Sequence, residues 1–153
     1  MKRALYFLVL FGFACNNHSS GGSNLNSRDI DSRQERIAML SKHIIMKSAI
    51  IDCEFDLFNV NGFGNDRLSV PGASSWNYKF AVLVNKEDVV KWTTGAKDTS
   101  FSQGFDWKPD LIQKRKEQWK LTSKPVFFIR DSADVIFEVY PEEGVIFEQI
   151  SNQ

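Results

Sequence analysis

The clearest signal for the fold lies in residues 125–150, which read PVFFIRDSADVIFEVYPEEGVIFEQI. Three runs of β-branched and aromatic residues, the types most enriched in strands, are separated there by two short polar turns. Turns this short join antiparallel neighbours. In such strands Phe127 and Phe128 point to opposite faces, as do Val135 and Ile136. The stretch therefore predicts a three-stranded antiparallel meander with apolar side chains on both faces.

Two further strands precede this meander. Residues 50–60 read IIDCEFDLFNV, in which apolar and acidic residues alternate as they do in a strand with one buried face. Residues 77–84 read NYKFAVLV and become almost wholly apolar in their second half, which is typical of a central strand. Together with the meander, these segments predict an antiparallel sheet of about five strands.

About three helices are predicted in the remainder of the chain. Ser32 and Glu35 have the spacing of a capping box, and apolar residues recur at helical spacing after them, so a helix is expected over 33–47. A short helix is expected over 86–93, and another over 109–120, where a proline suits the first turn. The predicted fold class is therefore α+β, with the helices packed mainly on one face of the sheet.

The first fifteen residues, MKRALYFLVLFGFAC, have the layout of a secretory signal peptide. Two cations precede an apolar run that is shorter than the roughly 20 residues a membrane span requires. The residues that follow are polar and rich in Gly, Ser and Asn, so they cannot bury enough apolar area to fold. The sequence thus predicts a signal peptide over 1–14, a flexible polar tether over 15–31 and a single globular domain over 32–153.

Residues 12–15, Gly-Phe-Ala-Cys, resemble the lipobox of bacterial lipoprotein precursors. In that family the peptide is cut just before the cysteine, which receives a diacylglycerol and usually an N-linked acyl chain such as palmitate. The resemblance implies that Cys15 is the lipidation site and that the protein is anchored in the cell envelope, facing the periplasm. In that family an aspartate directly after the cysteine implies the inner membrane. The resemblance therefore implies the outer membrane for this chain, which has Asn16 at that position. Gly12 and Ala14 also suit an ordinary signal peptidase, which leaves a soluble secreted protein as the alternative.

Charge and cysteine content narrow the classes of function. The chain has 19 basic and 19 acidic residues, and loss of Lys2 and Arg3 with the leader leaves 17 against 19, a net charge of −2. This balance argues against non-specific binding of nucleic acid by the domain. The chain has 2 cysteines, so acylation of Cys15 would leave Cys53 without an intrachain partner, whereas a free Cys15 would allow a disulfide between them.

The sequence contains no motif that predicts a catalytic centre, a metal site or a cofactor. It has 2 histidines and lacks nucleophile-elbow, Walker, Rossmann, zincin and zinc-finger patterns. Two charged groups are candidates for binding a protein partner, the alternative for both being an ordinary solvated surface. One is an acidic row on a strand and the other lies on a basic helix: Asp52, Glu54 and Asp56, and Lys114, Arg115 and Lys116.

These observations favour a lipid-anchored envelope protein with a non-catalytic binding domain. One form of this hypothesis is an immunity or inhibitor protein that blocks a toxin or hydrolase acting in the envelope. The alternatives are a structural envelope lipoprotein without a soluble partner and an envelope hydrolase that uses Cys53 or acidic residues. No cofactor, metal or nucleic acid is expected in any of the three.

Overall fold

The computed structural model describes residues 23–63, 75–99, 105–130 and 134–152. The signal peptide predicted over 1–14, together with Cys15, lies outside these residues. The described strands are β1 (Asn24–Asn26), β2 (Ile50–Asn59), β3 (Trp76–Val84), β4 (Lys97–Asp98), β5 (Val126–Arg130), β6 (Asp134–Tyr140) and β7 (Val145–Asn152). The described helices are α1 (Arg33–Leu40), α2 (Val89–Thr93) and α3 (Lys108–Leu111), with 3-10 turns η1 (Lys86–Asp88) and η2 (Gln113–Arg115).

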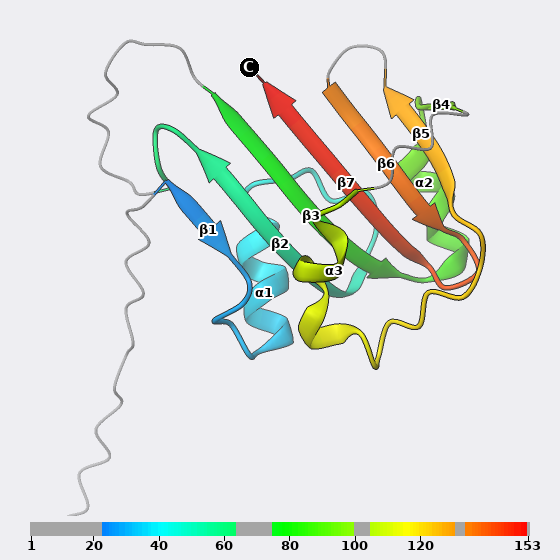
Figure 1. Ribbon diagram of the computed structural model, residues 1–153, viewed down its shortest axis with the longest axis horizontal. Helices are drawn as coiled ribbons and strands as arrows, with labels where there is room; N and C mark the ends of the chain where they lie inside the picture. Colours follow the sequence, from blue (N-terminus) through cyan, green and yellow to red (C-terminus); the bar gives the residue numbers. More distant parts are fainter. Residues whose placement is uncertain (1–22, 64–74, 100–104, 131–133, 153) are drawn as a thin grey trace, which may run out of the picture.

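The seven described strands form one antiparallel sheet in the order β1-β2-β3-β7-β6-β5-β4 (Figure 1). The α+β class with an antiparallel sheet is confirmed, but the sheet has seven strands rather than about five. The two additional strands, β1 and β4, contain three and two residues and form the two edges. Segments this short cannot display an alternating pattern, which is why the sequence did not reveal them.

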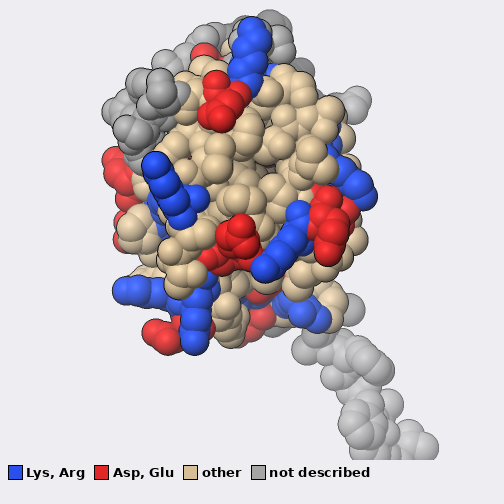
Figure 2. Space-filling model, turned by 90° about the vertical axis from the view of Figure 1, so that its right-hand side faces the viewer, with Lys and Arg blue, Asp and Glu red and all other residues tan. Residues whose placement is uncertain are grey.

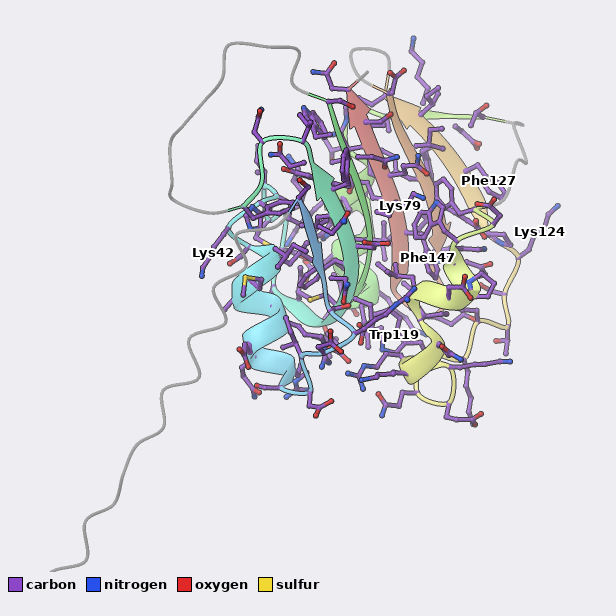
Figure 3. All side chains as sticks on the ribbon, turned by 60° about the vertical axis from the view of Figure 1, so that its left-hand side comes forward. Lys42, Lys79, Trp119, Lys124, Phe127 and Phe147 are labelled. Atoms are coloured by element: carbon purple, nitrogen blue, oxygen red, sulfur yellow. The ribbon has the colours of Figure 1, made fainter. Side chains whose placement is uncertain are left out.

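The register divides the sheet into two buried faces. Phe80 on β3 lies opposite Phe55 on β2 and Glu148 on β7, so these three side chains share a face. We call it the α1 face, because α1 and α2 pack on it; its buried apolar residues include Leu40, Cys53, Phe55, Phe80, Trp92, Phe137 and Ile146. We call the opposite side the α3 face; its buried apolar residues include Ala81, Leu111, Ile112, Trp119 and Phe147. Trp119 and Phe147 are labelled in Figure 3.

The helices thus cover both faces of the sheet, whereas the sequence predicted them mainly on one. Both long predicted helices are also shorter than expected. The capping box is confirmed, since the Ser32 hydroxyl accepts a hydrogen bond from the Glu35 amide, but α1 ends at Leu40 instead of residue 47. The Ser41 hydroxyl donates to the Ala38 carbonyl, which satisfies a carbonyl of the last turn as the helix ends.

The helix predicted over 109–120 is α3 alone, and a 3-10 turn replaces its continuation. Ile112 leaves helical geometry with φ −95° and ψ 14°. The altered path brings the Arg115 guanidinium to the Glu54 carboxylate on β2, with Nε and Oε1 2.7 Å apart. An ion pair with the sheet therefore accompanies the loss of regular helix in this segment.

The predicted tether over 15–31 also needs correction at its C-terminal end. β1 lies within it and pairs with β2, and Leu25 is 6% exposed within the α1-face core. Beyond β1 the Ser27 amide donates to the Phe55 carbonyl, which extends the contact with β2. The folded domain therefore begins before residue 32. Within the described ranges, no helix combines the length and apolar character that crossing a bilayer requires.

Candidate functional site

A pocket of about 350 Å³ opens on the α1 face near the start of β3 and the end of β7. Three segments of sheet and the chain that follows α1 build it. Its lining residues are His43, Ile44, Ile45, Lys47, Trp76, Tyr78, Phe80, Arg130, Glu148 and Ile150. We call it the Glu148 pocket. Most of this lining is apolar and only a few polar groups converge on it, which is the usual character of a small-molecule site.

Strand alternation explains the aromatic wall of the pocket. Trp76, Tyr78 and Phe80 occupy every second position along β3, so all three point to the α1 face. The Trp76 and Tyr78 rings contact each other with centroids 5.0 Å apart. Opposite them, Ile150 pairs with Tyr78 and Glu148 pairs with Phe80. The β3–β7 register thus places one acidic side chain beside a row of aromatic rings.

Glu148 is the unusual member of this lining. Its side chain lies on the core-facing side of β7 and the residue is 5% exposed. Among the described residues, no hydrogen bond or ion pair involves its carboxyl group. Burial raises the pKa of Glu148 to about 7, although the positive charges of Arg130 and Lys47 oppose the rise. A carboxyl group of this kind can exchange a proton near neutral pH.

Two cations and a histidine complete the polar lining. The Arg130 guanidinium lies over the Phe137 ring, 5.1 Å from its centroid, and donates a long hydrogen bond of 3.4 Å to the Trp92 carbonyl. Lys47 is exposed at the pocket margin. Burial and the nearby Lys42 lower the pKa of His43, which favours its neutral form. Positive charge therefore predominates around the single acid.

The predicted acidic row occupies a different place, where two of its members are internal. Asp52 and Glu54 are 7% and 2% exposed. Arg36 reaches round the edge of β2, with Nη2 2.5 Å from Asp52 Oδ1 and Nε 3.5 Å from Glu54 Oε1. Its Nε also donates to the Cys53 carbonyl at 2.9 Å. Arg115 adds a second cation, 2.7 Å from Glu54 and 3.6 Å from Asp52.

The structure thus joins Asp52 and Glu54 of the predicted acidic row to Arg115 of the predicted basic group. The helical prediction for the basic segment missed this contact, because sequence alone does not say which strand face α3 covers. Burial leaves Asp52 and Glu54 little surface to offer a partner. Asp56 is exposed, and so are Lys114 and Lys116. These three residues do not gather into one site, since Lys114 donates to the Arg28 carbonyl while Lys116 lines a separate groove.

That groove, of about 710 Å³, runs along α3 and the segment that follows it on the α3 face. Lys108 at its end pairs with the buried Glu138, whose Oε2 has no hydrogen-bond partner in the described part of the chain. Tyr140 donates to Glu138 Oε1 at 2.8 Å. Burial and Glu138 raise the pKa of Tyr140 above its ordinary range. This acid therefore has a cation and a phenol as partners, unlike Glu148.

On the side of the molecule that carries β4 and β5, charges of both signs lie around an uncharged central area (Figure 2). Among the described residues on this side, the charged side chains form no large patch of a single sign of charge. Cys53 is buried, and burial raises the pKa of its thiol to about 12, so this cysteine is not an activated nucleophile. In the described ranges, no cluster of three or more potential metal ligands is found.

Comparison with known protein-family models, curated proteins and solved structures gives no match for this chain. The candidate site therefore depends on its geometry alone. Sequence reasoning missed Glu148, Arg130 and the aromatic wall of the pocket. One signal was present in the sequence. Ile146, Glu148 and Ile150 occupy every second position of a predicted strand, which places an acid between two apolar residues on one face.

Proposed function

We propose that this chain is a lipid-anchored protein of the bacterial cell envelope whose domain binds a small ligand in the Glu148 pocket without a chemical reaction. The leader, with its lipobox-like residues ending at Cys15, supports the location. The pocket supports binding as the role of the domain. The polar residues before β1 suit a spacer between membrane and domain.

The observation that carries the binding role is the isolation of Glu148. A buried polar group without a partner destabilises a fold, and the penalty is larger for a group that can ionise. Glu148 lies in such a position at the wall of an open pocket, while the buried acids Asp52 and Glu54 both have arginine partners. An unpaired acid at a pocket is typical of a ligand site.

The location can be tested with cells that express the full chain. We expect labelled palmitate to enter the wild type and not a Cys15→Ala variant, and the wild type to fractionate with membranes. A mature protein that begins at residue 15 with an unmodified thiol would contradict lipid anchoring and support the soluble secreted alternative.

The binding role can be tested by native mass spectrometry of protein purified from its own envelope. We expect a bound small molecule on the wild type, and its loss in Ile150→Trp, because the larger side chain would fill the pocket. The control is Ile129→Trp, since Ile129 is 42% exposed and does not line the pocket. Equal occupancy in the wild type and both variants would place the ligand elsewhere.

The second candidate function is an immunity or inhibitor protein for an envelope toxin or hydrolase. The exposed Asp56 favours it, because this acid lies beside Phe58, which is 38% exposed, in a shallow hollow that Lys79 also lines. Mixed charged and aromatic groups of this kind suit a protein interface. An Asp56→Lys change should weaken partner association more at low salt than at high salt, and unchanged association would remove this surface from consideration.

A further inference from the structure

The Glu148 pocket contains an excess of positive charge. Arg130 comes from β5, Lys47 and His43 come from the chain after α1, and Glu148 comes from β7. The lowered pKa of His43 favours its neutral form. Two cations thus face one acid, and the excess becomes larger when that acid takes up a proton. A cationic ligand would be repelled by Arg130 and Lys47, and a neutral ligand would leave their charges unbalanced.

The acid and the cations of the pocket are not paired with one another. Neither Arg130 nor Lys47 forms an ion pair with Glu148, although both act on its proton affinity. Among the described residues, the guanidinium of Arg130 has one long hydrogen bond, to the Trp92 carbonyl. Most of its donors are therefore available to an acceptor in the pocket.

We propose that the Glu148 pocket binds a ring-bearing organic carboxylate, with its ring against Trp76 and Tyr78 and its carboxylate between Arg130 and Glu148. This inference rests on the proposed function and names the ligand class for the same site. Glu148 participates in its protonated form: its O–H donates a hydrogen bond to the ligand carboxylate, and no covalent bond changes. The two cations balance the ligand charge, and the aromatic wall receives the apolar ring.

This arrangement makes binding depend on pH. The pKa of Glu148 is about 7. At a pH above this value the carboxyl group is mostly ionised, and it must take up a proton from solvent before it can donate to the ligand. Between pH 6 and pH 8 the protonated fraction of such a group falls about tenfold, and carboxylate affinity should fall with it. His43 does not reverse this sign, because any proton that it takes up at low pH would also favour a carboxylate ligand.

Two matched probes test the proposal: 3-phenylpropionate and its amide, 3-phenylpropionamide. They share the ring and chain and differ in charge. For ligands of this size we expect Kd values of roughly 1 mM, within reach of NMR titration. Binding is followed on the Trp76 indole N–H, assigned with a Trp76→Phe variant, in the folded mature domain at pH 6 and pH 8.

We expect 3-phenylpropionate to bind about tenfold more weakly at pH 8 than at pH 6 and the amide to bind equally at both. In Glu148→Gln, which retains a neutral donor, carboxylate binding should no longer depend on pH. Lys47→Gln should weaken carboxylate binding roughly twofold to fivefold and leave the amide unaffected. The control is Lys124→Gln, because Lys124 is exposed and lies outside the pocket lining (Figure 3).

The outcomes separate this inference from the proposed function. If the amide binds as tightly as the carboxylate at both pH values, the ligand class is wrong and the small-molecule site stands. Persistence of the pH dependence in Glu148→Gln would also overturn the inference, because the proton would then belong to another group. If neither probe shifts the Trp76 signal, both the inference and the proposed site fail.

Discussion

Replacing Glu148 by glutamine should stabilise the folded domain at neutral and alkaline pH while leaving its stability at low pH almost unchanged. Glutamine has nearly the shape of the protonated acid and carries no charge. At low pH the wild type holds a neutral carboxyl group in the pocket, so the two proteins have similar groups there. At higher pH the wild type alone must keep a negative charge in a buried position, where no described residue bonds to it.

The expected magnitude follows from the rise in pKa from 4.5 to about 7. The folded state binds the Glu148 proton more tightly than the unfolded chain does. Its contribution to stability is therefore complete below pH 4.5 and is lost as the pH rises through 7. Each tenfold change in proton affinity corresponds to about 1.4 kcal/mol, so the full loss is about 3 kcal/mol. The variant does not incur this loss.

The assay is urea denaturation of both proteins, followed by tryptophan fluorescence, at half-unit steps from pH 4 to pH 8. The difference in unfolding free energy should grow by about 1.4 kcal/mol per pH unit between pH 5 and pH 7 and level off above. The matched control is Glu117→Gln, because Glu117 is exposed and no ion pair involves it among the described residues. A constant difference across this range, or a variant less stable than wild type at pH 8, would refute the reasoning.

Three further predictions concern the rest of the domain. Arg36→Met should destabilise the fold by about 3–5 kcal/mol in denaturant titrations, because two buried carboxylates lose a cation, whereas the exposed Arg33→Met should change little. Gly144→Ala should be clearly more destabilising than Gly95→Ala. Both glycines have positive φ, but only at Gly144 would the new Cβ lie 2.3 Å from a backbone oxygen. Equal decreases in the melting temperatures of the two variants would contradict this. In a protein that lacks Cys15, iodoacetamide should modify Cys53 only as fast as the domain unfolds. Rapid labelling of the native state would contradict this.

The sequence predicted the long strands because burial imposes a pattern on them. Alternation in residues 50–60 and the apolar run in 77–84 correspond to β2 and β3. The ends of the helices were less predictable. Apolar residues at helical spacing, such as Ile44, suggested that the first helix continues past Leu40, yet Ile44 packs on the core from a non-helical segment. Tertiary packing satisfies the same apolar pattern with a different backbone.

The predicted binding residues show a second limit. Acidic residues at every second position of a strand indicate that one face is polar, and the simplest interpretation is a face in contact with solvent. In the fold, α3 and Arg36 cover part of that face, so Asp52 and Glu54 lie between two arginines while Asp56 stays exposed. Sequence shows the sign of each charge but not the cation that will meet it, since Arg115 is 61 residues from Glu54 along the chain.

The two kinds of buried acid in this sheet differ in what they do for the fold. Glu54 accepts hydrogen bonds from Ser27 and Arg115, so its charge is balanced within the domain. Glu148 has comparable burial and no such donor among the described residues, although glutamine or leucine at this position would avoid the penalty. Folding therefore does not account for an acid at position 148. The proposed ligand would account for it, because it would bring an acceptor to Arg130 and to protonated Glu148 and so supply a partner that the described residues do not provide.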